Sequence, residues 1–94
     1  MLIQNKTEGG KGIFYIEQNG QQLAEMVYSL PVPGKMIVEH TEVDDSLSGQ
    51  GIGKQLVHNA VEYARQNQLK IIPVCPFTKS VLEKLKEWQD VLQR

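Results

Sequence analysis

Three glycines at alternating positions, Gly49, Gly51 and Gly53, stand at the start of a segment with a helical pattern. Glycine costs about 1 kcal/mol relative to alanine inside a helix, so this spacing needs a reason. The free amides at a helix start bind anions, and the helix dipole adds partial positive charge. Glycines let a phosphate reach the main chain, and Lys54 can add a charge. We therefore expect the amides from Gln50 to Lys54 to bind a pyrophosphate.

The spacing of these glycines differs from two better-known phosphate loops. A P-loop reads Gly-x-x-x-x-Gly-Lys-Ser/Thr, whereas Gln55 follows Lys54 here. A Rossmann loop reads Gly-x-Gly-x-x-Gly after the first strand of a parallel unit, whereas this chain has Gly-x-Gly-x-Gly. The alternative interpretation is a tight turn that binds nothing.

Four further side chains have types that suit group transfer. Cys75 is the only thiol and is a candidate nucleophile, if a helix start or a base lowers its pKa. His40 is a candidate general base, because imidazole is the side chain most often used in that role, and Glu39 and Glu42 are alternative bases nearby. Each also has a structural interpretation, because single cysteines and histidines often pack in cores. The acidic residues from 39 to 45 either attract a cationic amine or form a solvated loop.

Composition limits the class of protein. The chain has 94 residues, of which 40% are hydrophobic and 22% charged, which predicts one compact domain over residues 1–94. A net charge of −1 gives no field that would attract nucleic acid or a membrane. One cysteine and two distant histidines cannot build a zinc cluster, so no metal is expected. The single cysteine and the absence of a signal-peptide pattern predict a cytoplasmic protein.

A β-hairpin is predicted early in the chain, where residues 12–18 and 21–30 flank Asn19-Gly20. Asn-Gly is the strongest short hairpin signal, because both turn positions need positive φ. A shorter strand at residues 2–5 is expected to precede the hairpin. In the hairpin arm at residues 21–30, the face toward the core is expected to carry Ala24, Met26, Tyr28 and Leu30.

A third long strand is expected at residues 35–43, followed by an amphipathic helix from about residue 50 to 66. Strict alternation divides the strand into two faces, Met36, Val38, His40 and Glu42 against Ile37, Glu39, Thr41 and Val43. The apolar stripe of the helix is Ile52, Leu56, Val57, Ala60, Val61 and Ala64.

A short strand at residues 70–74 and a second helix from about 78 to 86 complete the pattern. Pro73 removes one ladder donor, so this strand is expected at an edge or splayed from its neighbour. The helix is expected to start with a capping box of Ser80 and Glu83. Its apolar stripe is expected to be Phe77, Val81, Leu85 and Trp88. The order predicts an α/β domain with an antiparallel start and a β-α-β crossover.

Residues 43–53, VDDSLSGQGIG, resemble the acetyl-CoA loop of the GNAT acetyltransferase superfamily, which usually reads Arg/Gln-x-x-Gly-x-Gly/Ala between a strand and a long helix. Gly51 and Gly53 match the two glycines, while Ser48 stands where Arg or Gln is usual. This departure removes one side-chain contact and spares the main-chain amides. HTEV from residue 40 and IIPVCPF from residue 71 are similar to a short, single-domain branch, so the resemblance covers about residues 12–92.

The resemblance implies a small GNAT-like fold, mostly an antiparallel sheet with two main helices. It implies an N-acetyltransferase that passes an acetyl group from acetyl-CoA to an amine, with Cys75 as one route for the transfer. The pantetheine arm would lie between splayed strands at 36–43 and 70–74, and Lys79 would reach an adenosine phosphate. The expected CoA contacts are Thr41, Val43, Gly49, Gln50, Gly51, Ile52, Gly53, Lys54 and Lys79, and the expected catalytic residues are Cys75, His40 and Glu42.

The chain departs from the superfamily pattern in two further ways, and two other functions are compatible with its residues. No tyrosine follows Tyr63, so the tyrosine that often protonates the leaving thiolate is missing. The early helices that usually wall the acceptor side are also missing, which favours an acceptor site open to a protein or peptide amine or completed by a partner subunit. A non-catalytic module that binds CoA or acyl-CoA would keep the loop without needing Cys75 or His40. An interaction domain would need none of these residues. The sequence names neither the acceptor nor the oligomeric state.

Overall fold

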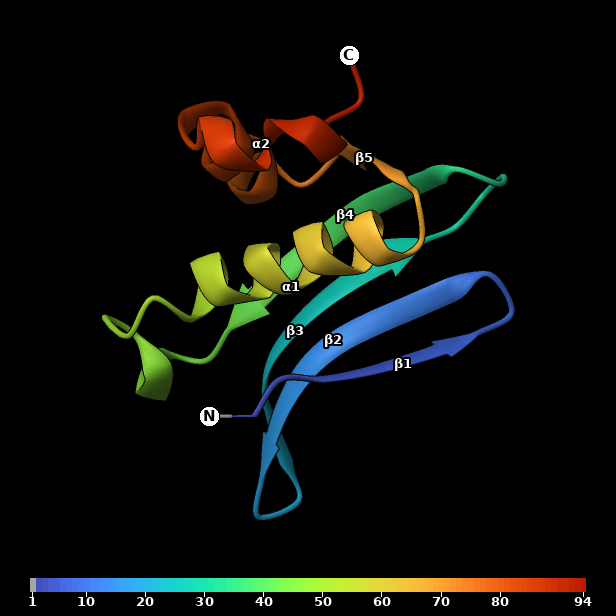
Figure 1. Cartoon of the computed structure of the whole chain (residues 1–94). Coiled ribbons are helices and arrows are strands. Elements are labelled where there is room, and N and C mark those ends of the chain that lie inside the picture. Colours follow the sequence, from blue (N-terminus) through green and yellow to red (C-terminus); the bar gives the residue numbers. More distant parts are fainter. Residues whose placement is uncertain (1) are drawn as a thin grey trace.

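The computed structural model describes residues 2–94 and contains one five-stranded sheet in the order β1-β2-β3-β4-β5 (Figure 1). The strands are β1 Gln4–Glu8, β2 Lys11–Gln18, β3 Gln21–Ser29, β4 Lys35–Val43 and β5 Lys70–Pro73. The first four strands pair antiparallel, and β5 pairs parallel with β4 at the edge. The predicted mixed sheet with a β-α-β crossover is confirmed, although β1 starts two residues later than expected.

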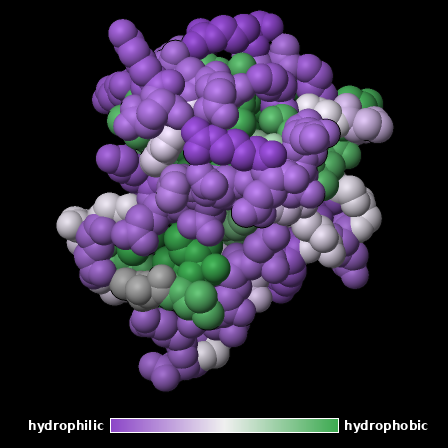
Figure 2. All heavy atoms as spheres, in the orientation of Figure 1, coloured by the Kyte–Doolittle hydropathy of each residue, from purple (hydrophilic) through white to green (hydrophobic). Residues whose placement is uncertain are grey.

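Helix α1 (Ile52–Gln66) makes the crossover from β4 to β5 and lies across the face of β3 and β4 (Figure 1). Its six predicted stripe residues are all buried, and its outer surface is hydrophilic (Figure 2). They pack on the predicted core face of β3, where Ala24, Met26 and Tyr28 are buried and Leu30 is half-buried. Neither α1 nor any other helix within residues 2–94 has the length and apolar character needed to cross a membrane.

Helix α2 (Pro76–Lys84) differs from the prediction at its start and in its buried side. It begins at Pro76, a residue favoured at the first helical position, and Cys75 is its N-cap. Ser80 therefore lies inside the helix, and the predicted capping box with Glu83 is wrong. The residues buried on α2 are Thr78 and Leu82 rather than the expected stripe starting at Phe77, which is 44% exposed. The predicted stripe is wrong because its first members line a groove instead of filling the core.

A β-bulge interrupts β4. The register places Val27 opposite His40 but Tyr28 opposite Val38, so Glu39 is an extra residue on β4. One extra residue reverses the alternation of inward and outward side chains beyond it.

The two faces of β4 beyond the bulge are therefore opposite to those predicted. Thr41 and Val43 pair with Met26 and Ala24, whose side chains are buried beneath the helices, and so share their face. His40 and the following Glu42 point to the other face and are exposed. The expected grouping of His40 and Glu42 with Met36 and Val38 is wrong, because strict alternation ends at a bulge.

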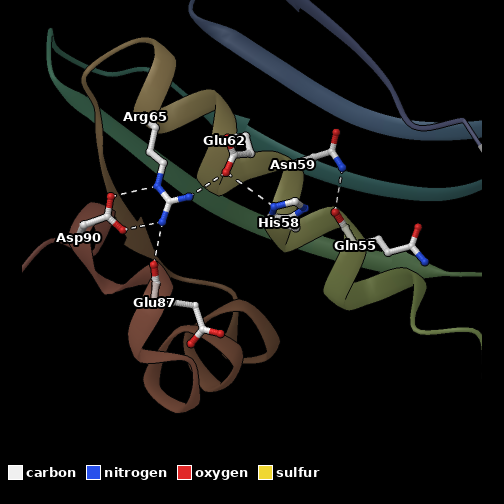
Figure 3. A network of polar contacts seen from close by, with 7 residues as sticks. All are labelled: Gln55, His58, Asn59, Glu62, Arg65, Glu87 and Asp90. Atoms are coloured by element: carbon white, nitrogen blue, oxygen red, sulfur yellow. Dashed lines mark hydrogen bonds and ion pairs between the residues drawn. The ribbon is translucent and has the colours of Figure 1, made fainter.

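The end of α1 holds the C-terminal 3-10 helix, Lys86–Val91, against the domain (Figure 3). The Arg65 guanidinium donates to both carboxylate oxygens of Asp90, at 3.0 and 2.9 Å, and to the Glu87 carbonyl at 2.7 Å. It also donates to Glu62 at 2.7 Å within α1. The hydrogen bonds from Arg65 hold the pKa of the Asp90 carboxyl below its ordinary value. These hydrogen bonds fix the chain beyond α2 against the end of α1.

Gly12 of β2 lies directly under the ring of Tyr28 on β3. A Cβ atom at Gly12 would come within 2.2 Å of the Tyr28 Cζ atom. The ring is fixed, because Tyr28 is fully buried and its hydroxyl accepts a hydrogen bond from Asn5 Nδ2 at 2.7 Å. Burial raises the pKa of Tyr28 to about 12, against the opposing effect of Asn5.

We expect Gly12→Ala to lower the free energy of unfolding by about 1–3 kcal/mol, the usual cost of overpacking a core. Urea unfolding measures this change. In a Tyr28→Leu background the same substitution should cost clearly less, because the obstructing ring is gone. An equal cost in both backgrounds would show that Gly12 is needed for another reason.

Candidate active site

The loop between β4 and α1 uses its glycines in two ways. Gly49 and Gly51 have φ values of +79° and +70°, in the left-handed region that favours glycine, and Gly51 is the N-cap of α1. Gly53 lies in the first turn of α1, where a Cβ atom would come within 2.7 Å of the Phe77 ring. Two glycines therefore shape the turn, and the third allows α2 to approach closely.

The amides in the first turn of α1 have no hydrogen-bond partner among residues 2–94. The N-cap residue, Gly51, has no side chain that could cap these amides, and no acidic residue lies in the turn. The first amides of a helix then need a partner from outside it, and the helix dipole favours a negative one. Leu47 and Ile52 are buried on either side of Gly49 and Gly51, which anchors the loop to the core. These are the amides that the sequence predicts as phosphate donors.

A groove of about 540 Å³ runs between this loop, β4 and α2. The predicted CoA contacts that line it are Thr41, Val43, Gly49, Gly51, Ile52, Gly53 and Lys54. Gln50 and Lys79 are exposed and do not line it. Sequence reasoning missed the contributions of Leu47, Ser48, Phe77 and Val81. Phe77 and Val81 were assigned to packing because apolar spacing on a helix does not distinguish a core face from a groove wall.

Strands β4 and β5 part where the groove reaches the sheet. Their pairing ends at Val38 and Pro73, and the amides of Val74 and Cys75 both donate to the Val38 carbonyl at 3.0 Å. Beyond this point β4 continues to Val43 without β5 beside it. The predicted edge position of β5 is confirmed, but all four of its residues pair with β4, so the two strands separate only after Pro73. We call this opening the splay.

Cys75 lies where the two strands part. It is 5% exposed, and its Sγ donates a hydrogen bond to Thr41 Oγ1 at 3.5 Å. Burial raises the pKa of the Cys75 thiol, but the Thr41 and Thr78 hydroxyls and the amides of Thr78 and Phe77 lower it by more. The pKa of the thiol therefore lies below its ordinary value, which favours the reactive thiolate.

His40 and Glu42 meet on the opposite face of β4, together with Glu25 of β3. His40 Nε2 lies 3.2 Å from Glu42 Oε2 and 3.8 Å from Glu25 Oε2. The His40 nitrogen and the two carboxylate oxygens lie within 4.8 Å of one another, close enough to hold one cation. Sequence reasoning missed Glu25, because only the register shows that it faces Glu42. The structure does not bring His40 to Cys75, since the bulge turns them to different faces.

A second groove, of about 390 Å³, lies at the end of β4. It is lined by residues 22–25 and 42–45, which include the carboxylates of Glu25, Glu42, Asp44 and Asp45. Asp44 is partly engaged, because its side chain accepts a hydrogen bond from the Ser46 amide, and its bonds to Ser46 lower its pKa. Val43 lines both grooves, so the acidic groove adjoins the loop groove.

Comparisons with known proteins identify the family. Residues 13–91 match the model of a protein family described as "GCN5-related N-acetyl-transferase". A GCN5-like protein from Staphylococcus aureus, solved by NMR, is 40% identical with a TM-score of 0.72, over 96% of this chain and 87% of that one. No curated protein sequence matches this chain.

More distant solved structures share the fold. A ribosomal-protein-alanine N-acetyltransferase from Brucella melitensis is 18% identical with a TM-score of 0.67, over 83% of this chain and 62% of that one. A GNAT family acetyltransferase from Elizabethkingia anophelis with acetyl-CoA bound is 17% identical with a TM-score of 0.58. The match covers 68% of this chain and 42% of that one. With the family match over most of its length, the chain belongs to the GCN5-related N-acetyltransferases and is an enzyme that uses acetyl-CoA.

Proposed function

We propose that residues 1–94 form one catalytic domain that passes the acetyl group through Cys75 to an amine of a protein or peptide. The observation that carries this proposal is the 3.5 Å contact between the Cys75 sulfur and Thr41, a residue that lines the loop groove. A thioester in the splay would lie beside a sulfur whose pKa is lowered by its surroundings.

The loop groove would hold acetyl-CoA by main-chain groups. The unpaired amides in the first turn of α1 bind the pyrophosphate, with Lys54 nearby as a positive charge. The open edge of β4, up to Val43, pairs with the amides of the pantetheine arm as a further strand would. This arrangement needs no side chain at Ser48, where the family usually has Arg or Gln.

Acetyl transfer then proceeds in two steps, first to Cys75 and then to the amine. The Cys75 thiolate attacks the acetyl carbonyl carbon, a carbon–sulfur bond forms, and CoA leaves as its thiolate. The acceptor ammonium loses one proton to solvent, and its nitrogen attacks the acetyl group on Cys75. The carbon–nitrogen bond forms, Cys75 leaves as a thiolate, and the second amine proton passes through water to His40, which lies on the other face of β4 between Glu25 and Glu42.

The acceptor would approach from the face that carries His40. The adjoining groove is lined by Glu25, Glu42, Asp44 and Asp45, which favour a cationic amine. Donor and acceptor thus use opposite faces of β4 and meet at the splay.

Incubation with acetyl-CoA should leave one hydroxylamine-labile acetyl group on wild-type protein, measured by intact mass after denaturation. Cys75→Ser should gain none, because it lacks the thiol, while its melting temperature should still rise with acetyl-CoA, since a bound ligand stabilises the native state. Turnover by Cys75→Ser at the wild-type rate would show direct transfer to the amine.

His40→Gln should slow the second step while leaving the first intact. Removal of a general base typically costs about 10²–10⁴-fold in rate. The test is the decay of preformed acetyl-Cys75 after addition of a lysine peptide. His58→Gln is the matched control, because His58 lies on α1 and stacks on Trp88. Equal decay in His40→Gln and wild type would remove His40 from the reaction.

Gly53→Ala should weaken acetyl-CoA binding about tenfold, which corresponds to a loss of about 1.4 kcal/mol of binding free energy. The new Cβ must displace the Phe77 ring, which lines the groove. Fluorescence or calorimetric titration measures the affinity. Stability should not fall, because alanine is the better helix residue. Unchanged affinity would show that the ring moves without disturbing the ligand.

A further inference from the structure

Thr78 is a buried polar residue without a partner. Its side chain is fully buried, and among residues 2–94 no group forms a hydrogen bond with its Oγ1. A buried hydroxyl left unpaired costs about 1–3 kcal/mol, and native proteins rarely tolerate one. The hydroxyl is therefore a donor that another state of this site can use.

The Cys75 side chain lies about one helical turn before this hydroxyl. Cys75 is the N-cap of α2 and Thr78 is the third residue of the helix. No hydrogen bond joins the Thr78 hydroxyl to the neutral thiol, yet Thr78 lowers the pKa of that thiol, as do Thr41 of β4 and the Phe77 amide. A neutral thiol is a weak hydrogen-bond acceptor, whereas hydrogen bonds to an ionised group are about twice as strong. Ionisation of Cys75 would supply the partner that Thr78 lacks.

We propose that Thr78 is a positioning residue that donates a hydrogen bond to Cys75 Sγ whenever the sulfur is a thiolate. Cys75 releases its proton to solvent, and Thr78 keeps its own. The inference rests on the proposed function, in which Cys75 carries the acetyl group.

The hydrogen bond would act most strongly when the sulfur leaves. In acetyl-Cys75 the sulfur is neutral, so Thr78 again lacks a strong acceptor. As the amine displaces the sulfur, negative charge returns to Sγ and the hydroxyl regains its partner. Thr78 therefore assists release of the acetyl group by stabilising the leaving thiolate.

The test compares Thr78→Val, which replaces the hydroxyl with a methyl group of similar size, with Thr78→Ser, which keeps the hydroxyl. Ser80→Ala, on the same helix, is the control. Because Cys75 is the only cysteine, thiolate absorbance minus that of Cys75→Ser gives its pKa directly. Thr78→Val should raise this pKa by about one to two pH units, Thr78→Ser should restore it, and Ser80→Ala should leave it unchanged. Acetyl-Cys75 should decay about tenfold or more slowly in Thr78→Val.

Stability separates this role from a structural one. Thr78→Val should keep or raise the melting temperature at low pH, where the thiol is neutral and the hydroxyl is unpaired. A lower melting temperature with an unchanged pKa would show that the hydroxyl only serves the fold, and would overturn the inference. If the valine variant does not fold, Thr78→Ala gives the same pKa comparison. A shifted pKa without any acetyl group on wild-type Cys75 would sustain the role of Thr78 toward the thiolate and refute the acetyl relay.

Discussion

The separation of β4 from β5 after Val38 and Pro73 is the constraint on which the site depends. Pro73 has no amide to continue the ladder, and the next two amides, of Val74 and Cys75, both turn to the Val38 carbonyl. The chain then enters α2 instead of extending the sheet. An open strand edge is normally a liability. Here it lies inside a groove, where a ligand that carries amides can pair with it.

The bulge at Glu39 gives this opening two different sides. Without the extra residue, Thr41 would face away from α2 and His40 would face the core. With it, Thr41 lies against the Cys75 sulfur on the helix face, and His40 joins two carboxylates on the other face. One inserted residue thus divides the thiol and the imidazole between the two faces of a single strand.

The edge strand β5, which ends two residues before Cys75, is short and needs support. The C-terminal segment provides it, because the Gln93 amide donates to the Ile71 carbonyl at 2.9 Å and Leu92 forms a parallel bridge with Ile71. Arg65 holds the preceding 3-10 helix through Asp90.

The sequence by itself determined the features that depend on neighbouring residues: the Asn19-Gly20 hairpin, the α1 stripe, the glycine turn and the break at Pro73. Each follows from backbone preferences or from a repeat along the chain. Only the tertiary structure decided four other features: the bulge, the buried side of α2, the position of Glu25 beside His40 and Glu42, and the contact of Cys75 with Thr41. These depend on which distant segments lie side by side and in what register, and a shift of one residue reverses a strand face without leaving a local signal.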